Sequence, residues 1–333
     1  MYRNKKILIT GGTGTIGYQL TRRLLQDKPA VIRIFSRDEY KQYDMSLEFE
    51  EHASRMRYLI GDVRDEQRLI RAMEDIDYVF HLAAMKHVPF CEYNPFEAVK
   101  TNVIGTQNVI QAAIQTGVKN VLFTSTDKAI SPTNTYGATK LTAERLISAA
   151  EYQKGPKTMI FSSVRFGNVM GSRGSVIPLF KKQIMEDRRI TVTDLNMVRY
   201  MMTASQAIDL MLLSNELAQG GEVFVLKMPV VRLSDLAEVL IDEVAKKNNI
   251  TEPVIIDEIG VRPGEKRFEE LMTDDEALVA AETPEMFVIP PAFGHTTWKP
   301  NEERKTAGRY SIASEQCISK ETLRDWLLME NLI

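Results

Sequence analysis

Short apolar runs alternate with amphipathic segments through the first half of the chain. Apolar residues are concentrated at positions 6–10, 31–36, 57–61 and 78–82, as in the buried strands of a parallel sheet. Residues 16–26 and 66–73 have the periodicity of helices that lie on a sheet. Strands that alternate with helices predict an α/β fold, here a Rossmann-type doubly wound parallel sheet.

A longer helix and two further strands are predicted next. The helical pattern covers residues 94–116 and stops at Gly117, and the apolar run 121–123 predicts another buried strand. Helical periodicity then continues past Lys140 to a break at residues 155–156, and a strand is expected over 158–165.

The alternation loosens from about Asn168, which predicts a smaller, discontinuous C-terminal substrate lobe. Its expected elements are a glycine-rich loop at 171–174, a helix over 176–185, short strands near Ile190 and Val223, a helix with Ser234 as N-cap, a tether at 290–308 and an amphipathic helix at 320–329. We predict a Rossmann domain over residues 1–167 with a returning segment near 200–230. Residues 168–199 and 231–333 are assigned to the lobe and tail.

Composition and charge exclude several classes of partner. The hydrophobic fraction of 44% is ordinary for a globular protein, and the net charge of −3 gives no electrostatic reason to expect nucleic acid or an anionic membrane. Cys91 and Cys317 are too few for a disulfide framework or a metal knuckle. Neither a signal-peptide core nor a membrane span is found in the sequence, so we expect a cytoplasmic protein.

A glycine run lies between the first predicted strand and helix. Gly11, Gly14 and Gly17 would let backbone amides approach a pyrophosphate at the helix N-terminus, although a glycine run alone also suits a tight turn. The predicted contacts are Gly11, Thr13, Gly14, Thr15, Ile16 and Gly17. The combination with Tyr136 and Lys140 downstream favours a dinucleotide site.

Residues after the second strand favour NADP over NAD. NAD sites usually place an acid at this strand end for the ribose diol, whereas Ser36 and Arg37, with Asp38 and Lys41 behind them, suit a 2′-phosphate. The alternative is that Arg37 and Lys41 are solvated charges at a helix entry. Asp62 is expected either to accept from the adenine amine or to cap a helix.

Acid and base groups are concentrated between Thr124 and Lys140. Thr126, Asp127 and Lys128 follow the strand at 121–123, at the sheet edge where open α/β folds place their chemistry. Tyr136 and Lys140 are about one helical turn apart, where the ammonium is expected to lower the pKa of the phenol.

These motifs together resemble extended short-chain dehydrogenase/reductases, and specifically the inverting UDP-N-acetylglucosamine 4,6-dehydratases. The resemblance covers about residues 6–287. It rests on the glycine run and on residues 36–39, 60–65, 83–89, 125–129, 136–140, 165–169, 171–176 and 262–266. A Thr-Asp-Lys triplet at 126–128 distinguishes these dehydratases from epimerases, which lack the Asp-Lys pair.

The resemblance implies a residue for each chemical step. Tyr136, assisted by Lys140, would remove the 4-hydroxyl proton while C4 hydride passes to NADP⁺. Lys128 would take the C5 proton and Asp127 would protonate the departing 6-hydroxyl. Lys128 must therefore be neutral for part of the cycle, which a desolvated site beside Lys140 is expected to favour. Return of the C5 proton from the opposite face would invert C5.

Further site residues are carried over from the same motifs. The remaining cofactor contacts would be Val63, Ala83, Lys86 and Val169. The substrate contacts would be Lys86, Asn168, Ser172, Arg173, Gly174, Ser175, Val176, Pro178, Arg199 and Arg262, with the last two as guanidinium forks for the uridine diphosphate. His81 and His87 are expected to pack at strand ends and not to bind a metal.

Two other functions are considered. In a UDP-sugar 4-epimerase Asp127 and Lys128 would be idle, and in a non-catalytic NADP-binding scaffold or sensor the whole catalytic set would be idle. The resemblance also implies a homo-oligomer, from dimer to hexamer, and a place in bacterial surface-glycan or nonulosonate biosynthesis.

Overall fold

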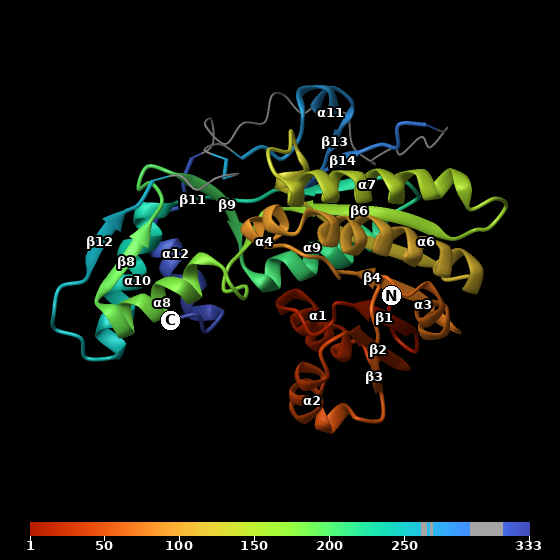
Figure 1. Ribbon diagram of the computed structural model, residues 1–333, viewed down its shortest axis with the longest axis horizontal. Helices are drawn as coiled ribbons and strands as arrows, with labels where there is room; N and C mark the ends of the chain where they lie inside the picture. The colour runs from red at the N-terminus through yellow and green to blue at the C-terminus, as the bar shows by residue number, and fades with distance from the viewer. Residues whose placement is uncertain (261–264, 267–268, 294–315) are drawn as a thin grey trace.

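The computed structural model describes residues 1–260, 265–266, 269–293 and 316–333. Figure 1 shows a large sheet with helices on both faces and a smaller group of elements beside it. Within the described residues the large sheet has nine strands, in the order β13-β14-β10-β6-β5-β4-β1-β2-β3. They are β1 (Lys6–Thr10), β2 (Val31–Ser36), β3 (Met56–Ile60), β4 (Tyr78–His81), β5 (Asn120–Thr126), β6 (Ile160–Phe166), β10 (Val223–Leu226), β13 (Ala281–Glu282) and β14 (Met286–Ile289).

Strand direction and order confirm the predicted Rossmann-type sheet. Every pairing from β3 across to β10 is parallel, and β14 and β13 are added antiparallel at the edge. The strand order reverses between β1 and β4. In open α/β sheets the ligand crevice forms outside the carboxyl ends of the strands at this point.

Helices cover both faces because their apolar stripes face the sheet. On one face lie α1 (Thr15–Gln26), α2 (Glu39–Glu48) and α9 (Ala204–Leu217), and Leu20 and Leu24 of α1 are fully buried there. On the other face lie α3 (Glu66–Met73), α6 (Gly105–Thr116) and α7 (Thr135–Gln153). The predicted helices 16–26 and 66–73 are therefore confirmed.

The helix predicted over residues 94–116 is formed in pieces. A separate helix, α4 (Val88–Tyr93), precedes α5 (Pro95–Ala98), a π-helical segment (Val99–Ile104) and α6. Asn102 in the π-helical segment turns inward, accepting from the Met85 backbone amide at 2.8 Å and donating to the Thr139 hydroxyl at 3.0 Å. A π-helical segment shifts the register of the helix, so this side chain points inward where α-helical periodicity would not place it. Gly117 ends α6 at φ 72° as predicted.

The smaller group of elements has its own apolar core. It contains the strands β7 (Asn168–Val169), β8 (Arg189–Val192), β9 (Val198–Met202), β11 (Val230–Arg232) and β12 (Ile255–Glu258), with the helices α8 (Val176–Asp187), α10 (Leu233–Lys247) and α12 (Lys320–Met329). Phe180, Leu240 and Leu327 pack together in this core. The predicted tail helix therefore packs in cis, and Arg324 forms an ion pair with Glu243 of α10 at 2.8 Å.

Three details differ from the sequence analysis. Ser234 is not an N-cap. Helix α10 begins at Leu233 with Arg232 as its N-cap residue, two residues before Ser234, and the Leu233 amide donates to the Met197 carbonyl oxygen at 2.9 Å. Strands β13 and β14 come from the segment assigned to the lobe, yet they pair with the large sheet. The short elements 3₁₀-helix η1 (Glu50–His52) and α11 (Asp274–Val279) were not predicted. Most of the expected tether, residues 294–308, lies outside the described residues.

Candidate active site

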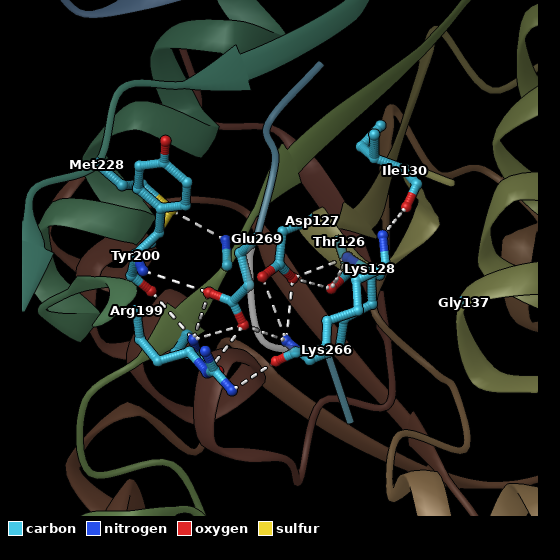
Figure 2. A network of polar contacts seen from close by, with 12 residues as sticks. Thr126, Asp127, Lys128, Ile130, Gly137, Arg199, Tyr200, Met228, Lys266 and Glu269 are labelled. Carbon is cyan, nitrogen blue, oxygen red and sulfur yellow. Dashed lines mark hydrogen bonds and ion pairs between the residues drawn. The ribbon is translucent and has the colours of Figure 1, made fainter. Parts of the chain in front are cut away.

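The carboxyl end of β5 carries an acid and an amine in direct contact. Thr126 is the last strand residue, and Asp127 and Lys128 open the 3₁₀ turn η3 (Asp127–Ala129). The Lys128 ammonium lies 3.1 and 3.2 Å from the two Asp127 carboxylate oxygens, and the Thr126 hydroxyl donates to Asp127 Oδ1 at 2.7 Å (Figure 2). Asp127 is 2% exposed, so its carboxylate is shielded from bulk water, whereas the Lys128 side chain is 28% exposed.

Helix α7 brings Tyr136 against the same turn. Its N-cap Asn134 accepts from the Gly137 amide at 2.8 Å, and this fixes the start of the helix. A Cβ on Gly137 would lie 2.1 Å from the Lys128 carbonyl oxygen, so only glycine permits this approach of helix and turn. The Thr126 side chain forms a hydrogen bond with Tyr136. Thr126, Asp127, Lys128 and Tyr136 thus meet in space.

Lys140 lies in a different environment from the one expected. Its ammonium group donates to the Thr124 carbonyl oxygen and lies 4.0 Å from the centroid of the Phe123 ring. Burial lowers the pKa of Lys140 to about 7. Burial raises the pKa of the Tyr136 phenol, and Lys128 is the cation that opposes this rise. The expected lowering of the phenol pKa is not found in this structure, and the assistance of Tyr136 by Lys140 stays a prediction.

Lys128 itself is held as an ammonium. Burial lowers its pKa, but the carboxylates of Asp127 and Glu269 raise it by more, so its net pKa lies above the ordinary lysine value. The expected bias toward a neutral Lys128 is not found. Conversely, burial raises the pKa of Asp127, but Lys128 and Thr126 bring it below the ordinary range. In this structure the pair is an ammonium and a carboxylate.

A cavity of about 940 Å³ lies along the carboxyl ends of β1, β2 and β4. It is lined by Gly11, Thr13, Gly14, Thr15, Ile16, Gly17, Ser36, Arg37, Asp38, Lys41, Asp62, Val63, Ala83 and Lys86, which are most of the predicted cofactor contacts. A Cβ on Gly11 would come within 2.8 Å of the Ala83 backbone, and one on Gly17 within 2.5 Å of Gly12. This glycine cradle fits a pyrophosphate approached by backbone amides.

The rim of this cavity at β2 is basic. Asp38 caps α2 by accepting from the Lys41 amide at 3.0 Å and also pairs with the Lys41 ammonium, so its carboxylate is already occupied. Arg37 is exposed and lies 3.8 Å from Asp62. Asp62 does not cap α3, a role taken by Asp65, and instead binds Arg64. The cap interpretation of Asp62 was therefore wrong.

A loop of the smaller lobe closes over the glycine cradle. The Arg173 amide donates to Thr15 Oγ1 at 3.1 Å, and its guanidinium binds the Thr13 carbonyl oxygen. Lys86 donates to the Arg173 carbonyl oxygen at 2.9 Å. Ser172 and Arg173, which were expected at the substrate, thus line the cavity beside the glycine cradle.

Two cavities of about 210 Å³ each share lining residues, and Asp127 lines the first of them. The first, called the sugar cavity here, is lined by Val88, Pro89, Asp127, Lys128, Asn134, Asn168, Arg199, Glu265, Lys266 and Glu269. The second includes Val169, Gly174, Ser175 and Val176, and it shares Asn168, Arg199 and Glu265 with the first. Val169 was expected at the cofactor but lies here. Pro178 lies on α8, and Arg262 lies outside the described residues.

Arg199 lines both cavities and Glu269 lines the first, and Figure 2 shows the two side chains in contact. The Arg199 guanidinium pairs with Glu265 and Glu269, each at 3.3 Å. Glu269 is 5% exposed and lies 3.5 Å from the Lys128 ammonium. Glu269 was not among the predicted site residues, because two adjacent glutamates in a polar segment are typical of a solvated surface.

His81 and His87 lie in different surroundings. His81 is fully buried between the hydroxyl groups of Thr10 and Thr106, at 2.7 and 3.0 Å, which confirms its packing role. His87 is the exposed N-cap residue of α4, so its expected packing at a strand end is not found. In the part of the chain that the structure describes, no helix has the length and apolar character needed to cross a membrane.

Known proteins resemble this chain over most of its length. The family model described as polysaccharide biosynthesis protein matches residues 7–291. A Campylobacter jejuni protein named UDP-N-acetylglucosamine 4,6-dehydratase (inverting) is 45% identical over 294 residues, covering 88% of this chain and 84% of that protein. A Rickettsia massiliae protein named UDP-glucose 4-epimerase is 40% identical, covering 87% of this chain and 84% of that protein.

Solved structures agree with this assignment. The X-ray structure of Pen from Bacillus thuringiensis is 57% identical, covers 98% of both chains and superposes with a TM-score of 0.92. A Streptomyces venezuelae dTDP-glucose 4,6-dehydratase with NAD and TYD bound, 24% identical with a TM-score of 0.70, covers 78% of this chain and 86% of that one and shares the fold. The resemblance drawn from the sequence is confirmed: the chain belongs to the polysaccharide biosynthesis protein family, together with the inverting UDP-N-acetylglucosamine 4,6-dehydratases.

Proposed function

We propose that the protein is an NADP-dependent nucleotide-sugar 4,6-dehydratase, a hydro-lyase that converts UDP-N-acetylglucosamine to a UDP-4-keto-6-deoxy-N-acetylhexosamine with inversion at C5. The observation that carries this proposal is the contact between the buried Asp127 carboxylate and the Lys128 ammonium group, beside Tyr136. Oxidation at C4 needs a base for the hydroxyl proton and a nicotinamide for the hydride. Elimination across C5 and C6 requires a second acid and base, which Asp127 and Lys128 would supply.

Each residue has one proton to move. Tyr136 must first lose its own proton, which the positive charge of an oxidised nicotinamide would favour, and the phenolate then takes the proton of the 4-hydroxyl group. The ketone formed at C4 acidifies the C5 proton. Lys128 removes that proton while Asp127 protonates the 6-hydroxyl group, which leaves as water. A bound nicotinamide dinucleotide would accept the hydride from C4 and return it to C6. Because Lys128 and Asp127 are charged in this structure, a proton must pass from one to the other before elimination.

The cavities support the assignment of ligands. The glycine cradle and the basic rim at Arg37 and Lys41 suit NADP, since the Asp38 carboxylate is occupied by its own helix. NAD is the cofactor named in the Streptomyces venezuelae structure. Asn168 and Arg199, at the junction of the two smaller cavities, suit the sugar and diphosphate of the substrate.

A 4-epimerase is the second candidate, because some relatives carry that name. It would move hydride at C4 and leave Asp127 and Lys128 unused. The buried contact between these residues favours the dehydratase. The intact acid and base set likewise argues against a scaffold without turnover.

The test is incubation of the purified protein and NADP⁺ with UDP-N-acetylglucosamine in heavy water. We expect loss of one water by mass spectrometry, deuterium at C5 and an inverted C5 by NMR, with no net NADPH. Epimerisation would leave the mass of the unlabelled sugar unchanged. Asp127→Asn should abolish water loss, whereas the exposed control Asp325→Asn on α12 should not. An unchanged substrate would refute the proposal.

The wider setting rests on the same resemblance. We propose that the Rossmann domain comprises residues 1–167 and the returning segment near 200–230, to which β13 and β14 are added through their pairing with the sheet, and that the remaining lobe holds the nucleotide sugar. We also propose a cytoplasmic homo-oligomer, from dimer to hexamer, that serves surface-glycan or nonulosonate biosynthesis. Size-exclusion chromatography with light scattering would measure the assembly.

A further inference from the structure

A second buried carboxyl group faces the acid and base pair. Glu269 lies 3.5 Å from the Lys128 ammonium and 3.3 Å from the Arg199 guanidinium, and it accepts from the Tyr200 amide at 3.3 Å. Figure 2 shows it on the opposite side of Lys128 from the Thr126 strand end. Because Glu269 also lines the sugar cavity, it occupies the space in which the elimination is proposed.

Asp127 and Glu269 both face the Lys128 ammonium group, at 3.1 and 3.5 Å. If that group gives up a proton, the two carboxyl groups can share it, because one then donates and the other accepts. Like charges on neighbouring buried carboxyl groups also disfavour a state in which both are ionised. The pair is buried, with 2% of Asp127 and 5% of Glu269 exposed, so water cannot screen that repulsion.

Charged and polar groups from several elements surround Glu269. Turn η3 contributes Asp127 and Lys128, and strand β9 contributes Arg199. From β7 the neutral Asn168 amide lies 3.4 and 3.5 Å from the two Glu269 oxygens. On its own segment, Glu265 pairs with Arg199, and the Lys266 ammonium binds the Ile130 carbonyl oxygen. Helix α7 adds Tyr136, which interacts with Lys128.

We propose, building on the dehydratase function proposed above, that Asp127 and Glu269 act as a dyad sharing one proton, with Glu269 as the positioning residue that makes Asp127 an acid. Asp127 beside Lys128 alone remains a carboxylate. The charge of a second carboxylate raises the pKa of the pair above that of either carboxyl group alone. The dyad can therefore take the proton that Lys128 must lose.

The elimination is then balanced without another reactant. An N–H bond of Lys128 breaks and an O–H bond forms in the dyad, which leaves a neutral amine and a protonated Asp127. The amine takes the C5 proton as the C5–H electrons form the C5–C6 double bond. The C6–O bond breaks, Asp127 gives its proton to that oxygen, and water leaves. Lys128 is again an ammonium and the dyad is again without its proton.

The titration of Glu269 agrees with this geometry. Burial and then Asp127 raise the pKa of Glu269 to about 7, against the opposing effects of Lys128 and Arg199. The dyad thus exchanges a proton near neutral pH.

Glu269→Gln tests the dyad, because glutamine keeps the size but cannot hold the proton. We expect kcat for water loss to fall by about 100-fold or more, the usual contribution of a general acid. Oxidation at C4 should continue, so reduced cofactor should accumulate during a single turnover. A merely structural role would slow both steps together. Glu270→Gln, the same change at the adjacent exposed residue, is the matched control. Wild-type water loss in Glu269→Gln, or equal loss of both steps, would overturn the proposal.

A substrate-free measurement separates this proposal from the proposed function. Infrared difference spectra taken across pH should show a carboxylic acid C=O band in the wild type that titrates near pH 7. The band should be absent in Glu269→Gln and present in Glu270→Gln. If the wild type leaves the nucleotide sugar unchanged, the dehydratase function fails, and the band alone decides the dyad. A wild-type spectrum without this titrating band would overturn the dyad even if water is lost normally.

Discussion

Substitution of Gly137 by alanine should disable the enzyme with little loss of stability. The new Cβ would lie 2.1 Å from the Lys128 carbonyl oxygen and 3.1 Å from Pro132 Cβ. An ordinary contact begins near 3.4 Å, so helix α7 and turn η3 must separate by about 1.3 Å (3.4 − 2.1). Tyr136 and Lys128 lie on opposite sides of this contact, and the separation therefore misplaces both.

Two opposing effects set the magnitude for stability. Alanine is favoured over glycine inside a helix by about 0.5–1 kcal/mol. Overpacking costs about 1–3 kcal/mol, so the net loss is at most about 2.5 kcal/mol and the variant should fold. A displacement near 1 Å in a catalytic site costs on the order of 100-fold in rate. We therefore expect kcat for dehydration to fall about 100-fold.

The assay compares kcat for dehydration with the free energy of unfolding in urea. Ala138→Ser is the matched control, because it adds one atom at the next residue, which faces solvent on the same helix turn. A Gly137→Ala variant that unfolds like the wild type and turns over within about twofold of it would refute the reasoning. It would mean that the close approach of α7 to η3 does not position the acid and base groups.

Three further predictions concern charge. Arg165→Met should lower the free energy of unfolding by about 3–5 kcal/mol in urea titrations. It leaves Glu144, now 2.6 Å from the guanidinium, buried without its cation, and leaves Glu276, now 2.9 Å from it, with Arg145 alone. A loss below about 1 kcal/mol would contradict this. The pKa of Lys140 is about 7 in the folded protein, against 10.5 for an unperturbed lysine, so the unfolded chain binds more protons between these two pH values. Stability should therefore rise with pH across that window, by up to about 1.4 kcal/mol per pH unit. Lys140→Met should flatten this rise in pH-dependent unfolding, and an identical slope would contradict it. Arg37→Ala should weaken NADPH binding roughly 10- to 100-fold in calorimetry and leave NADH binding nearly unchanged, whereas equal losses would show that Arg37 does not contact the 2′-phosphate.

The sequence predicted the layout of the sheet because that layout depends on local patterns. Apolar runs and helical periodicity located β1, β2 and α3 at their observed bounds, and the tail helix α12 as well. The glycine run predicted its cradle for the same reason, since a close backbone approach at Gly11 and Gly17 leaves no room for a Cβ.

Local patterns failed where a distant segment decided the outcome. The π-helical segment around Asn102 exists because its side chain binds Met85 and Thr139, which no helical periodicity records. The N-cap was wrongly placed at Ser234 because a bond from the Leu233 amide to Met197 starts the helix earlier. Strand β14 joins the sheet through pairing with β10, a contact between residues far apart in the chain.

The chemistry divides in the same way. The sequence by itself determined the fold class, the dinucleotide cradle and the identity of the acid, the amine and the phenol, because each depends on residues close together in the chain. Only the tertiary structure decided their electrostatics. It turned Lys140 toward Thr124, gave Lys128 the position beside the Tyr136 phenol, and brought Glu269 from a distant segment to within 3.5 Å of Lys128. Burial and charge neighbours set a pKa, and both are properties of the folded chain.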